Sequence, residues 1–292
     1  MPGLALAVFL DAQAPPAPAA GAGVEVRALT VSFLDEQRGD VAELSAADVA
    51  LTENGVAREI TSFKPDRRPL SLALIVDTSA ALGASYRLNI VDAVSGLLAR
   101  LPEGARFAVW TSGDRPSKLV DFSDDREAAT KALRRVAPQG GNYMLDALVE
   151  ASTDLKKSGR EGDRTAVVAI TSTGPEFSYR DRFRSFEGAQ HKADLFLGVQ
   201  IDADGADFET RASLGYVLER LASESGGRQE TILSPMGLDG ALRKLSTALR
   251  AGYRVAYATV PDLAKRKLEF SVARPKTKVL VPAVSASQGT RP

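Results

Sequence analysis

The most regular feature of the hydrophobic pattern is the run from Leu70 to Val76, in which six of seven residues are apolar. A run this short and this apolar predicts a β-strand that is covered on both faces, as in the middle of a parallel sheet. The run ends in Asp77, Thr78 and Ser79, so a carboxylate and two hydroxyls follow the carboxyl end of the strand. Open α/β sheets bind ligands at that edge, and we expect a polar site there.

Strands and helices alternate along the middle of the chain. Short apolar runs predict further buried strands at residues 106–110, 166–170 and 195–199, and a more polar strand at residues 117–122. Apolar residues at helical spacing predict helices within residues 87–101, 126–136, 144–157, 214–221 and 238–249. This alternation predicts right-handed crossovers and an α/β fold with helices on both faces of a mostly parallel sheet.

Both ends of the chain show the alternating pattern of half-buried strands. Residues 24–33 alternate in part, and residues 48–63 predict a hairpin around an Asn-Gly turn. Near the other end, residues 253–258 and 267–272 alternate, and residues 278–281 are a further candidate strand. Short strands cannot bury a core alone, so we expect the two ends to meet in a small antiparallel β layer.

Composition narrows the class of protein. Hydrophobic residues make up 44% of the chain, which is ample for a core. Lys plus Arg and Asp plus Glu are 37 each, and this balance argues against a nucleic-acid-binding protein. There is no cysteine, which excludes disulfides, thiolate metal sites and cysteine nucleophiles.

The N-terminus resembles a secretion signal. Residues 4–10 form a short apolar run, followed by the small-x-small triplet Ala12-Gln13-Ala14, although no Lys or Arg precedes the run. We expect an exported protein, periplasmic or secreted, with a plain disordered leader as the alternative. No run in the sequence is long enough to be an integral membrane segment.

These patterns divide the chain into five parts. They are a signal peptide and linker (1–23), an N-terminal β segment (24–68), a central α/β domain (69–251), a C-terminal β segment that pairs with the N-terminal one (252–282) and a disordered tail (283–292).

The order of the motifs resembles that of bacterial von Willebrand factor A-related proteins, in which an A-type domain lies between flanking β segments. The resemblance covers about residues 24–282 by the ordered set of matching elements. It is carried by the strand ending in Asp-Thr-Ser, Leu-Pro-Glu-Gly at residues 101–104, Asp-Phe-Ser-Asp-Asp-Arg at 121–126, Gly-Gly-Asn-Tyr-Met-Leu-Asp at 140–146 and Tyr-Arg-Val-Ala-Tyr at 253–257. The resemblance implies a doubly wound, Rossmann-like sheet with a short antiparallel edge strand at residues 117–122. It also implies protein interaction instead of catalysis.

The same resemblance implies a degenerate metal-ion-dependent adhesion site. Asp77 and Ser79 match the family motif, but its third position is Ala81, which has no oxygen ligand in its side chain. Asn142 stands where the family has a threonine, and the second aspartate is replaced by Ser172 or Thr173. With Asp77, Ser79 and Asn142 as the remaining ligands, we expect no cofactor, and Mg²⁺ binding at millimolar concentrations or weaker. For Asp77 itself, the favoured interpretation is a carboxylate that caps loop amides, with a metal ligand as the alternative.

The main functional hypothesis is a non-enzymatic module that binds a protein partner through loops at the carboxyl ends of the strands. The site residues are Asp77, Ser79, Asn142, Tyr143, Ser172 and Thr173, and the binding loops are expected at residues 80–86, 113–116, 139–143 and 172–179. The alternative is a structural or assembly protein whose terminal β layer docks to a partner while the A-type domain is a scaffold.

Other motifs give weaker signals for chemistry. His191 is the sole histidine and has no neighbouring catalytic motif, so a solvated helix-end residue is favoured. Residues 202–207 resemble the start of a calcium loop, but its twelfth position is Ser213, which favours a solvated turn. Residues 180–184 could bind an anion, although a mixed-charge helix face is the simpler interpretation. A hydrolase that uses Ser79 lacks an evident base.

Overall fold

A computed structural model describes residues 25–35, 39–41, 43–202, 208–261 and 266–283. Within these residues the central sheet has six strands in the order β11-β10-β9-β6-β7-β8, parallel except for the antiparallel edge strand β8. Its strands are β6 (Leu70–Val76), β7 (Arg106–Thr111), β8 (Ser117–Ser123), β9 (Arg164–Ser172), β10 (Leu195–Ile201) and β11 (Arg228–Ile232). The predicted sheet and its antiparallel edge strand are therefore confirmed.

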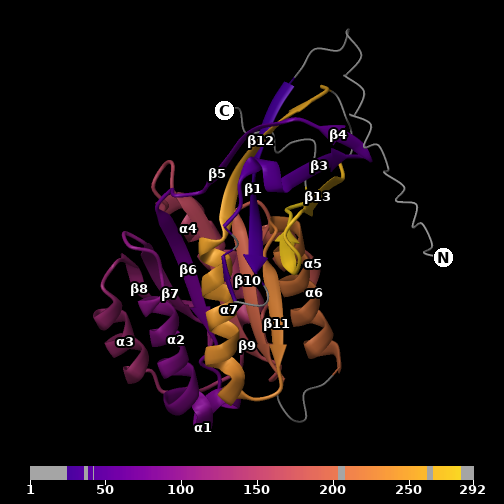
Figure 1. Cartoon of the computed structure of the whole chain (residues 1–292). Helices are drawn as coiled ribbons and strands as arrows, with labels where there is room; N and C mark the ends of the chain where they lie inside the picture. The colour runs from indigo at the N-terminus through magenta and orange to yellow at the C-terminus, as the bar shows by residue number, and fades with distance from the viewer. Residues whose placement is uncertain (1–24, 36–38, 42, 203–207, 262–265, 284–292) are drawn as a thin grey trace, which may run out of the picture.

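Helices cover both faces of this sheet (Figure 1). Helices α2, α3 and α7 share one buried cluster with the sheet, and α4, α5 and α6 share the other. The helices are α1 (Gly83–Ser85), α2 (Val91–Ala99), α3 (Arg126–Arg135), α4 (Met144–Ser158), α5 (Arg182–Ala189), α6 (Phe208–Ser225) and α7 (Leu238–Arg250). A π-helix (Tyr86–Ile90) and three 3₁₀ helices (Ala46–Asp48, Ala80–Leu82 and Pro235–Gly237) complete the helical elements of the described chain.

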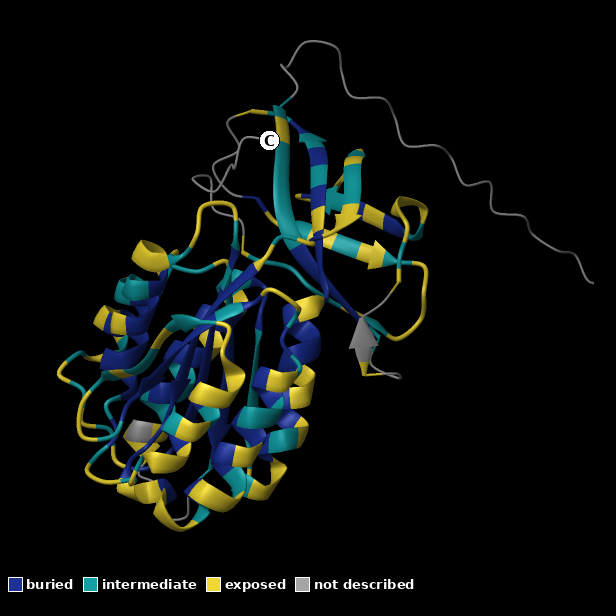
Figure 2. Ribbon diagram, turned by 90° about the vertical axis from the view of Figure 1, so that its left-hand side faces the viewer, coloured by how far each residue is buried: buried dark blue, intermediate teal, exposed yellow. Residues whose placement is uncertain are grey.

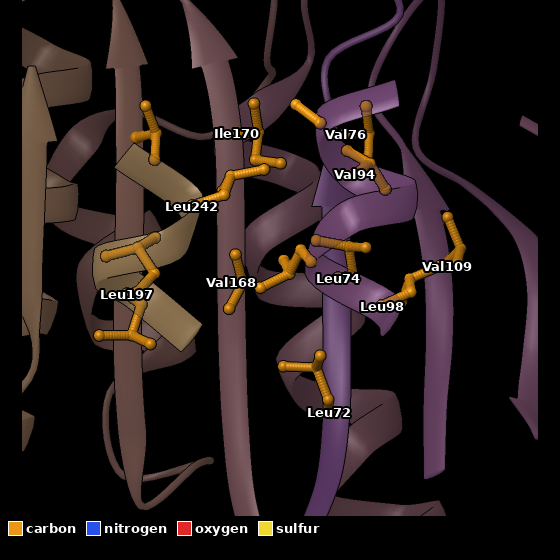
Figure 3. Close-up of a cluster of buried hydrophobic side chains, with 14 of the residues drawn as sticks. Leu72, Leu74, Val76, Val94, Leu98, Val109, Val168, Ile170, Leu197 and Leu242 are labelled. Carbon is orange, nitrogen blue, oxygen red and sulfur yellow. The ribbon is translucent and has the colours of Figure 1, made fainter. Parts of the chain in front are cut away.

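Strand β6 is buried along its whole length, and this explains its apolar run. Leu72 and Leu74 belong to the cluster under α2 and α7, where Figure 3 shows them beside Leu98 and Val168. Ala73 and Ile75, on the other face of the strand, belong to the cluster under α4. A central strand of a doubly covered parallel sheet has no solvent face, so apolar residues point to both sides, and the one polar residue, Ser71, donates a hydrogen bond to Asp163.

The two ends of the chain meet in antiparallel sheets, as the sequence predicts. The N-terminal strand β1 pairs with the late strand β12 over eight residues, from Glu25 opposite Thr259 to Ser32 opposite Gly252. One sheet has the order β14-β1-β12-β5 with β2 beside β1, and a second has the order β13-β3-β4. The strands are β1 (Glu25–Asp35), β2 (Asp40–Val41), β3 (Val49–Glu53), β4 (Val56–Arg58), β5 (Ile60–Pro65), β12 (Gly252–Thr259), β13 (Leu268–Val272) and β14 (Thr277–Leu280).

The predicted hairpin at residues 48–63 is only partly right. Asn54 and Gly55 form its turn with φ values of 52° and 79°, as a type I′ turn requires. The second half of the predicted hairpin forms two strands instead of one. Strand β4 pairs with β3, whereas β5 pairs with β12 in the other sheet. The ring of Phe33 joins the two sheets, since it lies 5.7 Å from Phe63 and 6.1 Å from Phe270.

The β layer and the carboxyl ends of the parallel strands lie at opposite ends of the molecule. Figure 1 places β1 and β12 at one end and α1, which follows β6, at the other. Figure 2 shows the β layer as a lobe beyond the helices of the central domain. A partner at one end therefore leaves the other end accessible.

Some sequence predictions differ from the structure or lie outside it. The predicted helix at residues 87–101 begins as a π-helix and becomes α-helical only from Val91. The predicted signal peptide and linker (1–23), most of the acidic turn at 202–207 and nearly all of the tail (283–292) lie outside the described residues. In the described ranges, no helix combines the length and apolar character that crossing a bilayer requires.

A buried ion pair lies inside the β layer. The side chains of Glu53 and Arg266 are both fully buried, and their charged atoms are 2.6 Å apart. Arg58 Nε also donates to Glu53, at 2.9 Å. Burial alone would raise the pKa of Glu53, but hydrogen bonds from Thr259 and Arg266 outweigh it, and the pKa falls below its ordinary value.

We predict that Glu53→Gln destabilises the protein by about 3–5 kcal/mol, because it leaves the buried Arg266 charge with only the more distant carboxylate of Glu25, at 3.9 Å. Urea unfolding at neutral pH measures the loss. The control is Glu269→Gln, which breaks the exposed pair with Lys267 and should cost less than about 1 kcal/mol. Equal losses in the two variants would contradict the prediction.

Candidate functional site

The predicted site centres on the carboxylate of Asp77, which is fully buried just beyond β6. Its Oδ1 accepts a hydrogen bond from the backbone N–H of Ser79 at 2.8 Å. Its Oδ2 accepts from the backbone N–H and the hydroxyl of Ser172, at 2.8 and 2.6 Å, and from the Asn142 amide at 3.2 Å. Protein donors thus occupy both carboxylate oxygens, as burial of an anion requires.

Asn142 is oriented by the hydroxyls around it. Its Oδ1 accepts a hydrogen bond from Ser112 Oγ at 2.6 Å, and its Nδ2 donates to Thr171 Oγ1 at 2.8 Å. Since the Ser112 hydroxyl donates to the oxygen, the amide nitrogen faces Asp77. The Asn142 oxygen therefore points away from the carboxylate with which it would share a metal ion.

Backbone contacts join the loops around Asp77. The N–H of Gln139 donates to the Thr78 carbonyl at 3.0 Å, and the N–H of Tyr143 donates to the Ser112 carbonyl at 2.8 Å. Gly113 lies so close to the first loop that a Cβ there would be 2.3 Å from the Thr78 carbonyl oxygen. No side chain fits at that distance, so Gly113 permits the close approach of the β6 and β7 loops.

The remaining predicted site residues separate into different environments. The Ser79 hydroxyl is buried and has no hydrogen-bond partner within the described residues. Ala81 packs against Gly174, where a Cβ would meet the Ala81 methyl at 2.6 Å. Thr173 turns away from Asp77 and donates to Asp202 at 3.3 Å. Of the two residues that could replace the second aspartate, Ser172 is therefore the one beside Asp77.

The acid nearest to this network in the loops is Glu176, which caps helix α4 instead of facing a shared metal position. Its carboxylate accepts from the backbone N–H of Met144 at 3.2 Å and of Ser178 at 2.9 Å. Burial raises the pKa of Glu176 to about 7, and the negative charge of Asp77 adds to the rise. Across the described part of the chain, no three or more His, Cys, Asp or Glu side chains converge as a metal-binding group.

Three aromatic side chains form the outer surface beside this network. We call Tyr143, Phe177 and Tyr179 the aromatic ridge, because the ring of Tyr143 lies 6.2 Å from each of the other two. Phe177 is 54% exposed and Tyr179 is 90% exposed. Gly141 supports the ridge, since a Cβ there would lie 2.0 Å from the Phe177 ring.

The loop that carries the ridge is anchored by a buried acid of α4. Asp146 is 3% exposed and accepts from the backbone N–H of Tyr179 at 2.9 Å and from the Arg180 guanidinium at 2.7 Å. Tyr143 was among the predicted site residues, whereas Phe177 and Tyr179 were included only as part of the predicted binding loop 172–179. The available signal for the others was the pair of aromatic residues in a polar loop after β9.

Comparisons with known proteins agree with the fold. Residues 72–175 match the family model of the von Willebrand factor type A domain. A von Willebrand factor type A protein from Catenulispora acidiphila has a TM-score of 0.54 and 12% identity, with 87% of this chain and 72% of that chain covered. Proximal thread matrix protein 1 from the mussel byssus, with a zinc-occupied MIDAS motif, has a TM-score of 0.50 and 14% identity, with 68% and 49% covered. At these identities the two structures show the fold.

A relative by sequence is an uncharacterized protein from Synechocystis sp., 27% identical over 173 residues. The match covers 58% of this chain and only 39% of that protein, so this chain spans much less than the whole relative. The chain therefore has a von Willebrand factor type A-like α/β fold, and its residues 72–175 match the model of that family. Domains of this class are generally non-enzymatic and mediate protein interactions, and bacterial proteins that contain them are often extracellular.

The raised pKa of Glu176 predicts a dependence of stability on pH. Because the folded state holds this proton up to about pH 7, whereas an ordinary glutamate loses it near 4.5, stability should fall as pH rises through that interval. We expect the stability of the wild type relative to Glu176→Gln to drop by roughly 1–3 kcal/mol between about pH 5 and pH 8. Urea unfolding across this range measures the difference.

The control for this experiment is Glu187→Gln, at an exposed glutamate of α5, which should shift the curve equally at every pH. Parallel curves for the wild type and Glu176→Gln would show that Glu176 is already ionised at low pH.

Proposed function

We propose that this protein is an exported, non-enzymatic binding module that recognises a protein partner through the loops around Asp77, without a divalent metal ion. The observation that carries the proposal is the set of protein donors on the Asp77 carboxylate, including the amide nitrogen of Asn142. These donors occupy the positions on the carboxylate that a cation would otherwise use.

Electrostatics favours this metal-independent state. A divalent ion at Asp77 would have one carboxylate to compensate for the loss of its hydration shell, and it would have to displace N–H and O–H donors. The buried Ser79 hydroxyl offers one neutral oxygen, and the Asn142 oxygen is engaged by Ser112. Mg²⁺ prefers several anionic or neutral oxygens in octahedral geometry, so these residues fit the ion poorly.

The aromatic ridge supplies the recognition surface on this proposal. Tyrosine and other aromatic residues are enriched among the residues that contribute most to binding at protein interfaces, because they bury a large area with few rotatable bonds. Hydrogen bonds to Asp77, Asn142 and Asp146 hold these loops in place, so the three rings keep one arrangement. A rigid surface loses little conformational entropy on binding.

A second candidate function, assembly through the β layer, is favoured by strand β4. Among the described strands β4 pairs only with β3, and Val56 at its start is 54% exposed. An edge strand with free backbone groups is a template for a strand from another chain. In this case the A-type domain would act as a scaffold.

We predict that excess Mg²⁺ or Mn²⁺ leaves the thermal unfolding temperature of the wild type unchanged within error. An ion at about a hundred times its Kd would add roughly 2.7 kcal/mol, which is readily measured. Asn142→Asp, which places a second carboxylate beside Asp77, should instead be stabilised by the same ions. Differential scanning fluorimetry with added ion or EDTA makes the comparison.

The matched control is the double variant Asp77→Asn with Asn142→Asp, which returns the site to one carboxylate and should again be insensitive to the ions. A rise in the wild type that disappears in Asp77→Ala would contradict metal independence.

The two candidate functions predict different effects on partner capture. We expect Tyr143→Ala with Tyr179→Ala to weaken binding by about tenfold or more, since two rings leave the interface. Val56→Ser should leave binding unchanged, as should EDTA. Affinity capture of the partner from the organism that encodes this chain, followed by titration of the purified partner, measures the effect.

The opposite result, loss of capture in Val56→Ser and full capture in the tyrosine double variant, would favour assembly through the β layer.

A further inference from the structure

A large cleft lies between the β layer and the amino-terminal edge of the central sheet. Its volume is about 890 Å³, and its walls come from β1, β12 and the ends of α4, α5 and α6. It lies at the opposite end of the parallel strands from Asp77. We call it the junction cleft, and it is separate from the site of the proposed function.

Cations without carboxylate partners surround the junction cleft. Lys156, Arg160, Lys192 and Arg254 line it, and in the described part of the chain none of the four forms an ion pair with a carboxylate. Lys192 Nζ donates to the neutral Thr153 hydroxyl at 2.6 Å. Burial lowers the pKa of Lys192, and the positive charge of Lys156 lowers it further. The cleft therefore holds positive charge in excess.

The acidic residues that line the cleft offset part of this charge. Glu224 forms an ion pair with Arg220 at 3.0 Å, and Asp194 accepts from the backbone N–H of Thr165 at 2.9 Å. Glu161 is exposed and has no ion pair in the described residues. Asp194 and Glu161 keep their negative charge, so the four cations without ion pairs face two such carboxylates, and the lining of the cleft retains a net positive charge.

The arrangement of the cations favours an extended ligand over a small anion. Lys156 lies on α4 and Arg254 on β12, so the charges are spread over different walls instead of converging on one point. The helices α4, α5 and α6 all present their carboxyl ends here, and their partial negative charge opposes an anion that lies against the helix ends, so the carboxylates of a ligand must reach the cations at the rim. Half-buried Leu29 and Ala193 provide apolar surface between the charges.

We propose that the junction cleft binds an extended acidic peptide segment of a partner protein. Its carboxylates pair with Lys156, Arg160 and Arg254 at the rim, and its apolar side chains contact Leu29 and Ala193. A volume of about 890 Å³ accommodates a short stretch of extended chain. Charge complementarity of this kind provides specificity and rapid association.

The test uses the full chain and a fluorescein-labelled peptide of alternating glutamate and alanine, with binding followed by fluorescence anisotropy at low salt. We expect saturable binding that weakens with added salt. Lys156→Ala with Arg254→Ala should weaken it by about tenfold, because the variant removes one cation from each wall. These two side chains are exposed, so the double variant should keep its unfolding temperature.

The matched control is Arg87→Ala with Arg135→Ala, which removes two exposed cations outside the cleft lining and should change binding by less than about twofold. Tyr143→Ala should also leave peptide binding unchanged, so that a failure of this inference is distinguishable from a failure of the proposed function. Equal binding of a peptide with glutamine in place of glutamate, equal loss in both double variants, or the absence of saturable binding would overturn the inference.

Discussion

The burial of one carboxylate, that of Asp77, is the constraint on which the candidate site depends. A buried anion is tolerated only when donors surround it, and here they come from the loop after β6, the loop between α3 and α4, and the end of β9. Each donor that Asp77 requires fixes the position of another loop. The network therefore determines the shape of the carboxyl-end surface as well as the charge within it.

In the same network, the residue type at position 142 determines whether Asp77 faces a hydrogen-bond donor or a metal ligand. At Asn142 an amide presents a nitrogen donor to Asp77, and its oxygen is held by Ser112. The amide nitrogen of Asn142 stabilises the Asp77 carboxylate as a bound cation would, since its N–H group brings partial positive charge to the carboxylate. Under the proposed function, the Asn142 amide takes the place of a metal ion, and unlike the ion it cannot dissociate. The aromatic ridge therefore keeps one arrangement in the presence or absence of metal.

Hydrophobic pattern predicted most of the fold, and the failures have physical causes. The buried strands from β6 to β10 stand out because both of their faces are covered, whereas β11 contains only one apolar residue, Ile232, and was missed. Asp77, Asn142 and Ser172 were predicted to share a site because the resemblance to the family motif places them together. The Glu53–Arg266 pair was not predicted, because its partners are 213 residues apart and charge alone carries no information about distance. The cap that Glu176 places on α4 was missed for the same reason.

The arrangement of the two candidate binding regions follows from the length of a single strand. Strand β6 has seven residues, so the Asp77 network and the junction cleft are separated by about 23 Å at ~3.3 Å per residue. Between them lie apolar strands that are packed on both faces. A close-packed core of this kind does not transmit a change in side-chain contacts from one site to the other. Sites that are this far apart and share no partner contribute nearly additively. It follows that a ligand in the cleft and a partner on the aromatic ridge can be bound together, each with its own affinity.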